Sequence, residues 1–239
     1  MSEFLSTTYE TLATEYYDAI RHPTCANFRE ASGQVLSQWL DELPLGKGWL
    51  CEVGPGKSML AELVNGRTYA MGRLVLVDSS LSMLAHSKKW AALGANLILG
   101  DATMLPVPSG SLELLVSSLG DPYNDIRFWK EASRVLRHNG FCLFTTPSYD
   151  WASTFRGNAD RETITWAQFE LSDGRRVRVP SYICPVDEQI KAVVENGLSV
   201  VRVVHIPATA LKLTHLSPKL LLGRGLTATV VTGYLITKT

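Results

Sequence analysis

The stretch that most constrains the fold is Trp49 to Leu63, where a short apolar run stops at two glycines and a helical pattern follows directly. Trp49 to Val53 predicts a strand, Gly54-Pro55-Gly56 predicts a tight turn, and apolar residues at helical intervals from Met59 predict the next helix. Glycines let a backbone approach a ligand closely, and the start of a helix points unpaired N–H groups and a partial positive charge at it. The stretch therefore predicts a cofactor-binding strand, turn and helix.

Two nucleotide-binding motifs match this turn only in part. Gly56-Lys57-Ser58 fits the end of an ATP-binding phosphate loop, but the first glycine of that motif would fall at Cys51, inside the strand. Gly54 and Gly56 fit the start of the dinucleotide motif Gly-x-Gly-x-x-Gly, but the third glycine, which allows close packing of the helix, would be Met59. One side chain therefore disfavours each of these motifs.

Acidic residues recur after the following strands, in phase with the glycine turn. Asp78 closes the apolar run Leu74 to Val77, and Asp101 follows the run Leu97 to Leu99. Because the carboxyl ends of parallel strands meet at one edge of an open α/β sheet, two βα units of similar length bring these acids to the turn. Together with Glu52, they resemble the cofactor motifs of class I S-adenosylmethionine-dependent methyltransferases of the ubiquinone- and menaquinone-biosynthesis type.

This resemblance runs from about Tyr9 to Phe144 and implies a fold, a cofactor and a reaction. The fold would be Rossmann-like α/β, with a seven-stranded, mostly parallel sheet, an antiparallel final strand and helices on both faces. The reaction would be in-line transfer of the methyl group of S-adenosylmethionine, which demands alignment and exclusion of water. Ser58 departs from the family pattern, in which a third glycine is frequent at this position.

In the resembling family, separate loops hold the parts of the cofactor. The glycine turn would contact the methionine part, Asp78 the ribose and Asp101 the adenine. Ser118 and Leu119 follow the predicted strand Leu112 to Val116 and would flank the sulfonium. The residues expected at the cofactor are Tyr17, Glu52, Gly54, Gly56, Asp78, Ser79, Met83, Asp101, Ala102, Ser118 and Leu119.

Residues 1–44 are expected to form an N-terminal lid and a packing helix. Apolar residues between 3 and 22 follow helical intervals, Pro23 ends that pattern, and a second apolar stripe predicts a helix from Asn27 to Leu43. The first segment resembles the one that closes over the cofactor in the family. We expect Tyr17 to face the sulfonium, because a tyrosine ring attracts a cation by on the order of 1 kcal/mol.

The candidate catalytic residues are Tyr123 and His205, and Trp151 is a further candidate for the substrate side. Asp121-Pro122-Tyr123 resembles the Asp-Pro-Pro-Tyr motif of amino-group methyltransferases, but it lacks one proline and comes late after its strand. Asp-Pro also begins ordinary turns. His205 closes a predicted strand and is a candidate base.

Residues 151–185 are expected to be an insertion on the substrate side, within a single domain of residues 1–239. We expect a loop from Trp151 to Asp160 and then a β-hairpin whose strands flank Ser172-Asp173-Gly174. A helix from Asp187 to Asn196 and two further strands would complete the sheet.

Composition favours a small acceptor. Lys plus Arg and Asp plus Glu number 23 each, so no global charge attracts nucleic acid or an anionic membrane. Four cysteines form no Cys-x-x-Cys pair, so we expect no metal and a reducing cytoplasm. We therefore expect a cytoplasmic enzyme with a small-molecule acceptor, and the oligomeric state stays open. The alternatives are a non-catalytic sensor or partner module that binds S-adenosylmethionine or S-adenosylhomocysteine, and a tRNA or protein methyltransferase.

Overall fold

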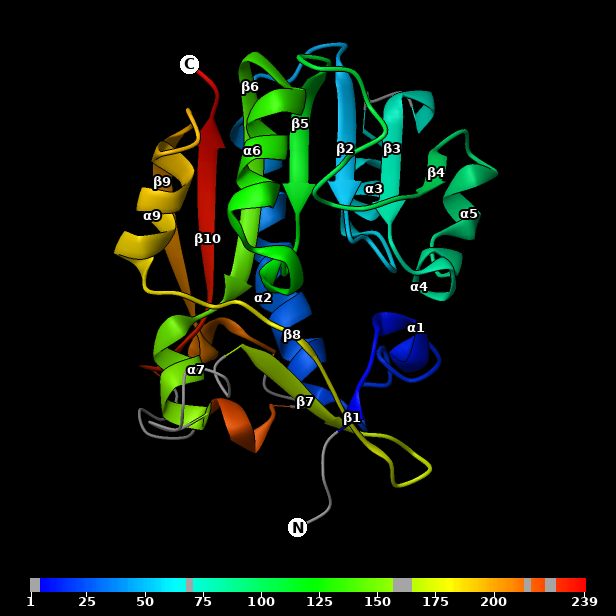
Figure 1. Cartoon of the computed structure of the whole chain (residues 1–239), viewed down its shortest axis with the longest axis vertical. Coiled ribbons are helices and arrows are strands. Elements are labelled where there is room, and N and C mark those ends of the chain that lie inside the picture. Colours follow the sequence, from blue (N-terminus) through cyan, green and yellow to red (C-terminus); the bar gives the residue numbers. More distant parts are fainter. Residues whose placement is uncertain (1–4, 68–70, 157–164, 213–215, 222–226) are drawn as a thin grey trace.

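The computed structural model of the chain describes residues 5–67, 71–156, 165–212, 216–221 and 227–239. Its largest sheet has the strand order β4 (Asn96–Leu99), β3 (Leu74–Asp78), β2 (Trp49–Val53), β5 (Leu112–Ser117), β6 (Leu136–Pro147), β10 (Thr229–Thr237) and β9 (Ser199–Pro207) (Figure 1). All neighbours pair in parallel except at β10, which is antiparallel to both β6 and β9. The expected Rossmann-like sheet with an antiparallel final strand is confirmed.

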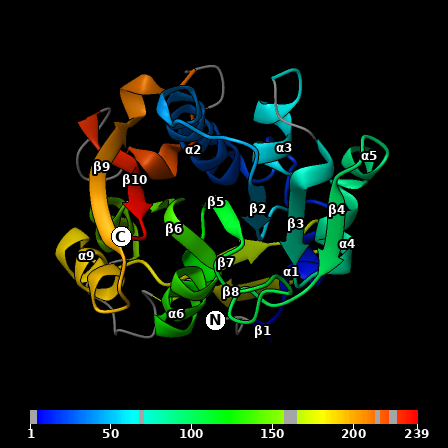
Figure 2. The same cartoon turned by 90° about the horizontal axis from the view of Figure 1, so that it is seen from above.

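Helices cover both faces of this sheet, as Figure 2 shows. On one face lie α2 (Pro23–Glu42), α3 (Met59–Val64), α4 (Leu81–Ala85) and α5 (Lys88–Ala91), and on the other lie α6 (Ile126–Val135) and α9 (Val186–Val194). Successive residues of a strand point to opposite faces, so Leu50 packs in one apolar cluster and Cys51 in the other. Burial on both faces explains why these strands read as continuous apolar runs.

Short polar side chains decide where the helices near the sheet edge begin. Ser58, Ser80 and Asp125 precede α3, α4 and α6, and the side chain of each accepts a hydrogen bond from a backbone N–H in the first turn. The described residues also contain four single turns of 3-10 helix, namely η1 (Met71–Arg73), η2 (Asp121–Tyr123), η3 (Ala208–Ala210) and η5 (Pro218–Leu220). Within the described ranges, no helix combines the length and apolar character needed to cross a membrane.

Two expectations about helix positions are wrong in detail. The helix expected from Asn27 begins instead at Pro23, because the N–H that proline lacks would be unpaired at the first helical position anyway. A loop was expected from Trp151, but the structure has the helix α7 (Tyr149–Arg156) at this position. Trp151 and Ala152 are buried there in an apolar cluster with Phe28 of α2. Tertiary burial, rather than a visible apolar period, stabilises this helix. Residues 157–160 of the expected loop lie outside the described residues.

A second, three-stranded sheet lies beyond the carboxyl ends of the parallel strands (Figure 1). The strands β7 (Trp166–Glu170) and β8 (Arg176–Pro180) form the predicted antiparallel hairpin, and β1 (Leu5–Ser6) adds in parallel to β8. Leu12, in the one-turn helix α1 (Tyr9–Leu12), packs with Phe169, Val177 and Val179 of this hairpin in one apolar cluster. The N-terminal segment and the hairpin therefore share one small core next to the sheet edge.

Candidate active site

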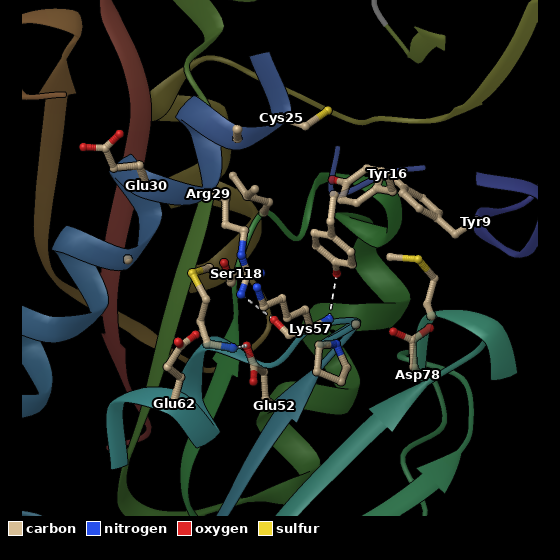
Figure 3. Close-up of a pocket in the computed structure, with 18 of the residues that line it drawn as sticks. Tyr9, Tyr16, Cys25, Arg29, Glu30, Glu52, Lys57, Glu62, Asp78 and Ser118 are labelled. Atoms are coloured by element: carbon tan, nitrogen blue, oxygen red, sulfur yellow. Dashed lines mark hydrogen bonds between the residues drawn. The ribbon is translucent and has the colours of Figure 1, made fainter. Parts of the chain in front are cut away.

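A cavity of about 650 Å³ opens at the carboxyl edge of the parallel strands (Figure 3). Its walls come from the N-terminal segment, α2, the glycine turn after β2, the end of β3 and the loop after β5. Small-molecule sites are typically of roughly 300 to 1,000 Å³, so the cavity has the size of such a site. The residues predicted at the cofactor that line it are Tyr17, Glu52, Gly54, Asp78, Ser79, Met83, Ser118 and Leu119.

The turn after β2 requires both of its glycines. Gly54 has a φ of 59° and Gly56 a φ of 45°, a left-handed backbone that other residues rarely adopt. A Cβ atom on Gly54 would lie 2.9 Å from the Tyr123 hydroxyl, and one on Gly56 would lie 2.0 Å from the Tyr17 hydroxyl. The turn is therefore enclosed by two tyrosines, one of which belongs to the N-terminal segment.

Glu52 is a buried carboxylate directly behind the turn, with an exposed fraction of 1%. It accepts hydrogen bonds from the Ser58 hydroxyl and from the N–H groups of Met59 (3.2 Å) and Leu60 (3.1 Å), at the start of α3. Burial raises the pKa of Glu52 to about 7, although the Ser58 bond and the charge of Arg29 act in the opposite direction. Glu52 thus fixes the angle between β2, the turn and α3.

Asp78 ties the end of β3 to the same turn. Its Oδ2 accepts a hydrogen bond from the Gly56 N–H (3.0 Å), and its Oδ1 accepts one from the Ser80 N–H (2.9 Å). Burial raises the pKa of Asp78, and these backbone donors oppose the rise. The carboxylate is held at the cavity wall, beside the glycine turn, where the sequence predicts the ribose.

The N-terminal segment is fastened over the cavity by polar contacts. Glu10 accepts hydrogen bonds from the Ser80 hydroxyl (2.5 Å) and the Ser82 N–H (3.2 Å) at the start of α4. The Tyr17 hydroxyl accepts a hydrogen bond from the Lys57 N–H (2.7 Å), in the glycine turn itself. Burial raises the pKa of Tyr17 to about 12, so this hydroxyl is neutral.

Arg29 of α2 is a cavity residue that the sequence did not reveal. Its guanidinium donates to the Lys57 carbonyl (2.5 Å) and lies 5.3 Å from the centroid of the Tyr17 ring. The apolar stripe of α2 predicts a packing helix, and nothing in that period distinguishes an arginine that faces a ligand from one that faces water. Arg29 places a positive charge beside the turn, where an anionic group can be bound.

Three hydroxyl groups hold the loop after β5. Ser32 of α2 is fully buried, and its Oγ lies 2.8 Å from the Ser118 Oγ and 2.7 Å from the Thr145 Oγ1. The Thr145 hydroxyl also accepts a hydrogen bond from the Leu119 N–H (2.9 Å). Leu119 has a φ of 54°, a conformation that costs about 1–2 kcal/mol for such a residue, so these bonds maintain a strained backbone at the cavity wall. Nothing in the sequence indicated that Ser32 and Thr145 would hold this loop.

The two residues expected at adenine lie outside the cavity lining. The Asp101 carboxylate is exposed, and its Oδ1 accepts hydrogen bonds from the N–H and the hydroxyl of Thr103, both at 2.7 Å. This carboxylate therefore bonds to its own loop, and Ala102 is buried behind it. The role of Asp101 and Ala102 at the cofactor stays a prediction.

The substrate-side candidates need correction. His205 is exposed on β9, with its Nδ1 3.3 Å from the Thr232 hydroxyl of β10, and it does not line the cavity. Trp151 is buried, with its ring 4.7 Å from that of Phe28 and its Nε1 donating to the Lys219 carbonyl (2.8 Å), so it is a core residue. In both cases strand or helix packing directs the side chain elsewhere.

Tyr123 does line the cavity, but its hydroxyl is already engaged. It donates a hydrogen bond to the Val53 carbonyl (2.8 Å) and lies 3.1 Å from the Ser117 Oγ. Burial raises its pKa far above the ordinary value, so the hydroxyl is neutral. Its hydrogen bond to the Val53 carbonyl supports the start of the glycine turn. Within the described ranges, no three His, Cys, Asp or Glu side chains are placed to hold a metal ion.

Comparison with known proteins gives a family match for the central part of the chain. The family model of the methyltransferase domain matches residues 51–144, which include the glycine turn, Asp78 and the loop after β5. No curated protein sequence matches the chain.

Solved structures match over nearly the whole chain at low identity. A putative S-adenosylmethionine-dependent methyltransferase from Listeria monocytogenes is 16% identical, with a TM-score of 0.65 over 87% of this chain and 98% of that one. An S-adenosylmethionine-dependent methyltransferase from Clostridium acetobutylicum is 16% identical, with a TM-score of 0.64 over 96% and 98%. Geranyl diphosphate C-methyltransferase from Streptomyces coelicolor, solved with S-adenosyl-L-homocysteine, is 12% identical, with a TM-score of 0.59 over 86% and 79%.

The fold and the cavity define a Rossmann-like α/β protein with a candidate small-molecule site at the carboxyl edge of its parallel strands. The family match identifies residues 51–144 as a methyltransferase domain, and solved structures of S-adenosylmethionine-dependent methyltransferases share the fold of the chain.

Proposed function

We propose that this protein is an enzyme that transfers the methyl group of S-adenosylmethionine to a small molecule, which binds in the cavity beneath the N-terminal segment. The observation that carries the proposal is that one cavity joins the glycine turn, Asp78 and the Ser118-Leu119 loop, while Tyr17 and α2 cover it. A cavity of this size suits a small acceptor better than a segment of tRNA or protein. Solved proteins with this fold include a geranyl diphosphate C-methyltransferase and a putative sarcosine dimethylglycine methyltransferase, so the fold alone leaves the acceptor open.

The residues of the cavity fit the cofactor by chemistry. The guanidinium of Arg29 suits the methionine carboxylate, and Asp78 suits a pair of ribose hydroxyls, whereas the N–H groups of Gly56 and Lys57 already donate to Asp78 and Tyr17. A Cβ atom at Gly54 or Gly56 would collide with Tyr123 or Tyr17, so the packing of the turn against these tyrosines requires both glycines. Asp101 and Ala102 are proposed at adenine on the resemblance alone.

When bound, S-adenosylmethionine supplies a methyl group on a positively charged sulfur. The contribution of the chain is to bind, to orient and to keep water out. Glu52 and Asp78 hold the glycine turn from behind, and Ser32 with Thr145 holds the loop that faces the methyl position. We propose that residues 1–44 and 151–185 together enclose the acceptor within one domain.

Thermal unfolding tests these roles directly. The protein is heated alone and with S-adenosylmethionine, S-adenosylhomocysteine, NADH or Mg-ATP. A ligand at about a hundred times its Kd adds roughly 2.7 kcal/mol, which is a shift of about 5–10 °C for a chain of this length. Only the two sulfur ligands should raise the midpoint.

A matched pair of variants locates the effect. Asp78→Ala should abolish the shift, whereas Asp187→Ala, an exposed aspartate in the first turn of α9, should retain it. Stabilisation by NADH or ATP instead of the sulfur ligands would show that the turn binds another cofactor. A shift retained in Asp78→Ala would remove Asp78 from the site.

A further inference from the structure

A chain of three hydroxyl groups ends in the cavity at Ser118. Ser118 lines the cavity and is half-buried, whereas Ser32 of α2 and Thr145 of β6 are both 0% exposed (Figure 3). The Ser32 Oγ lies 2.8 Å from the Ser118 Oγ and 2.7 Å from the Thr145 Oγ1. The Leu119 N–H donates to the Thr145 Oγ1 (2.9 Å). The chain thus starts at the backbone of the β5 loop and returns to the neighbouring side chain of that loop.

The direction of these hydrogen bonds follows from counting hydrogens. Each hydroxyl has one hydrogen to donate and can accept from two donors. Thr145 accepts from Leu119, so its own hydrogen needs an acceptor, and among the described residues the Ser32 Oγ is the one in reach. Ser32 then accepts from Thr145 and donates to Ser118. In this order, both buried hydroxyl hydrogens are paired.

Every other direction leaves a buried hydrogen unpaired. If Ser118 donated to Ser32 and Ser32 to Thr145, the Thr145 hydrogen would have no acceptor at a position that water does not reach. If Ser118 and Thr145 both donated to Ser32, the Ser32 hydrogen would be the unpaired one. A buried donor without a partner is costly enough to favour the first order about tenfold or more.

The Ser118 hydrogen is therefore directed into the cavity. The Ser118 Oγ accepts from Ser32, which is the only hydrogen-bond partner of this hydroxyl among the described residues. Water can accept the hydrogen before a small molecule binds, but a bound molecule displaces that water. The molecule must then offer a lone pair at this point, or the donor stays unpaired. The bond that starts the chain also holds Leu119 at a φ of 54°, which keeps the loop in this orientation.

The charged side chains of the cavity do not provide a comparable signal. Both signs line it, with the cations Arg29, Lys57 and Lys212 and the acids Glu30, Glu52, Glu62 and Asp78. The side chains of Lys57, Glu62 and Lys212 are exposed, so water weakens their interactions with a ligand. Arg29 is directed to the Lys57 carbonyl, in the glycine turn. The net charge of the lining therefore selects no acceptor, whereas the direction of the Ser118 hydroxyl is fixed.

We propose that Ser118 selects the acceptor, because its hydroxyl donates a hydrogen bond to a carbonyl or carboxylate oxygen of the molecule that is methylated. This inference rests on the proposed function, in which the sulfonium and its methyl group lie beside this loop. Those two groups share a positive charge and accept no hydrogen bond. A nitrogen nucleophile uses its single lone pair in the transfer, so it cannot pair with Ser118 at the same time. Carbonyl and carboxylate oxygens accept without donating, and they match a site whose fixed property is a donor.

The experiment first identifies the acceptor. The full-length protein is incubated with methyl-labelled S-adenosylmethionine and a protein-free metabolite extract, and the labelled product is identified by mass spectrometry. The main product should contain a carbonyl or carboxylate group. A main product without one would overturn the role of Ser118, while methyl transfer to a small molecule stands. No labelled small molecule, although both sulfur ligands raise the unfolding midpoint, would overturn the proposed function and this inference with it.

Variants then test the hydroxyl with that acceptor. Ser118→Ala should raise the KM for the acceptor about tenfold or more and change kcat less, because an enclosed oxygen loses its donor. The Kd for S-adenosylmethionine, measured by calorimetric titration, should not change. Ser118→Cys keeps a lone pair for Ser32 but is a weak donor, so it tests the hydrogen separately should Ser118→Ala fail to fold. Ser111→Ala, the same change just before the other end of β5, should leave all three constants unchanged.

An analogue of the acceptor that lacks the carbonyl or carboxylate oxygen completes the test. The wild type should bind the analogue with a KM about tenfold or more above that of the acceptor, and Ser118→Ala should not distinguish the two molecules. Equal discrimination by both proteins, or an unchanged KM in Ser118→Ala and Ser118→Cys, would refute the role of Ser118. A raised Kd for S-adenosylmethionine with an unchanged KM for the acceptor would assign the hydrogen to the cofactor instead.

Discussion

Replacing Glu52 by glutamine should remove a pH dependence of stability that this single carboxyl group causes. Glu52 is 1% exposed, and burial raises its pKa from the ordinary 4.5 to about 7. Between these two pH values the unfolded chain has already released the proton while the folded chain still holds it. A rise in pH therefore favours the unfolded state, and the contribution that is fully present below pH 4.5 is lost as the pH passes 7.

The magnitude follows from the width of that interval. Each pH unit within it changes the free energy of unfolding by about 1.4 kcal/mol for one proton, so the whole interval amounts to about 3 kcal/mol. This is a large part of the 5–15 kcal/mol that is typical of a folded domain. The hydrogen bonds from Ser58, Met59 and Leu60 limit the rise of the pKa but do not reverse it.

The assay compares denaturant unfolding of the wild type and Glu52→Gln at several values between about pH 5 and pH 8. The free energy of unfolding of the variant also differs from that of the wild type by an amount that does not depend on pH, because an amide cannot accept all the hydrogen bonds that the carboxylate accepts. The informative quantity is the slope of the difference, since ionisable groups elsewhere act on both proteins alike. The stability of the wild type should fall relative to the variant as the pH rises. A difference that stays constant across this range would refute the raised pKa and the burial of a proton at this position.

Three further predictions concern residues around the cavity. Arg29→Gln should weaken S-adenosylmethionine binding at least tenfold by calorimetric titration, since a charge-assisted hydrogen bond is lost, and the exposed Arg21→Gln should not; equal affinities would contradict this role. Ser32→Ala should lower the free energy of unfolding by about 1–3 kcal/mol in urea titration, because the hydroxyls of Ser118 and Thr145 lose their bridge, and a loss within experimental error would show that they find other partners. Glu10→Gln should accelerate amide hydrogen exchange in residues 9–17, because its carboxylate fastens this segment to the start of α4, and unchanged exchange would mean that apolar packing alone holds it.

The sequence alone determined the features that arise from neighbouring residues. Apolar runs with Gly54 and Gly56 between strand and helix predicted β2, the turn and α3, and the spacing to Asp78 placed the second loop at the same edge. The hairpin β7–β8 followed from alternation on either side of a glycine turn. These features follow from local periodicity and turn chemistry, which report which face of a segment is buried.

Only the tertiary structure decided which side chains from distant elements meet in the cavity. Arg29 and Ser32 lie on a helix whose apolar stripe predicts packing and nothing more, yet they reach the glycine turn and the β5 loop. His205 and Trp151 carry suitable chemical groups, but strand pairing and core packing direct them away. The physical reason is that the period of a segment identifies its buried face, whereas the partner of that face depends on how segments far apart in the chain pack together.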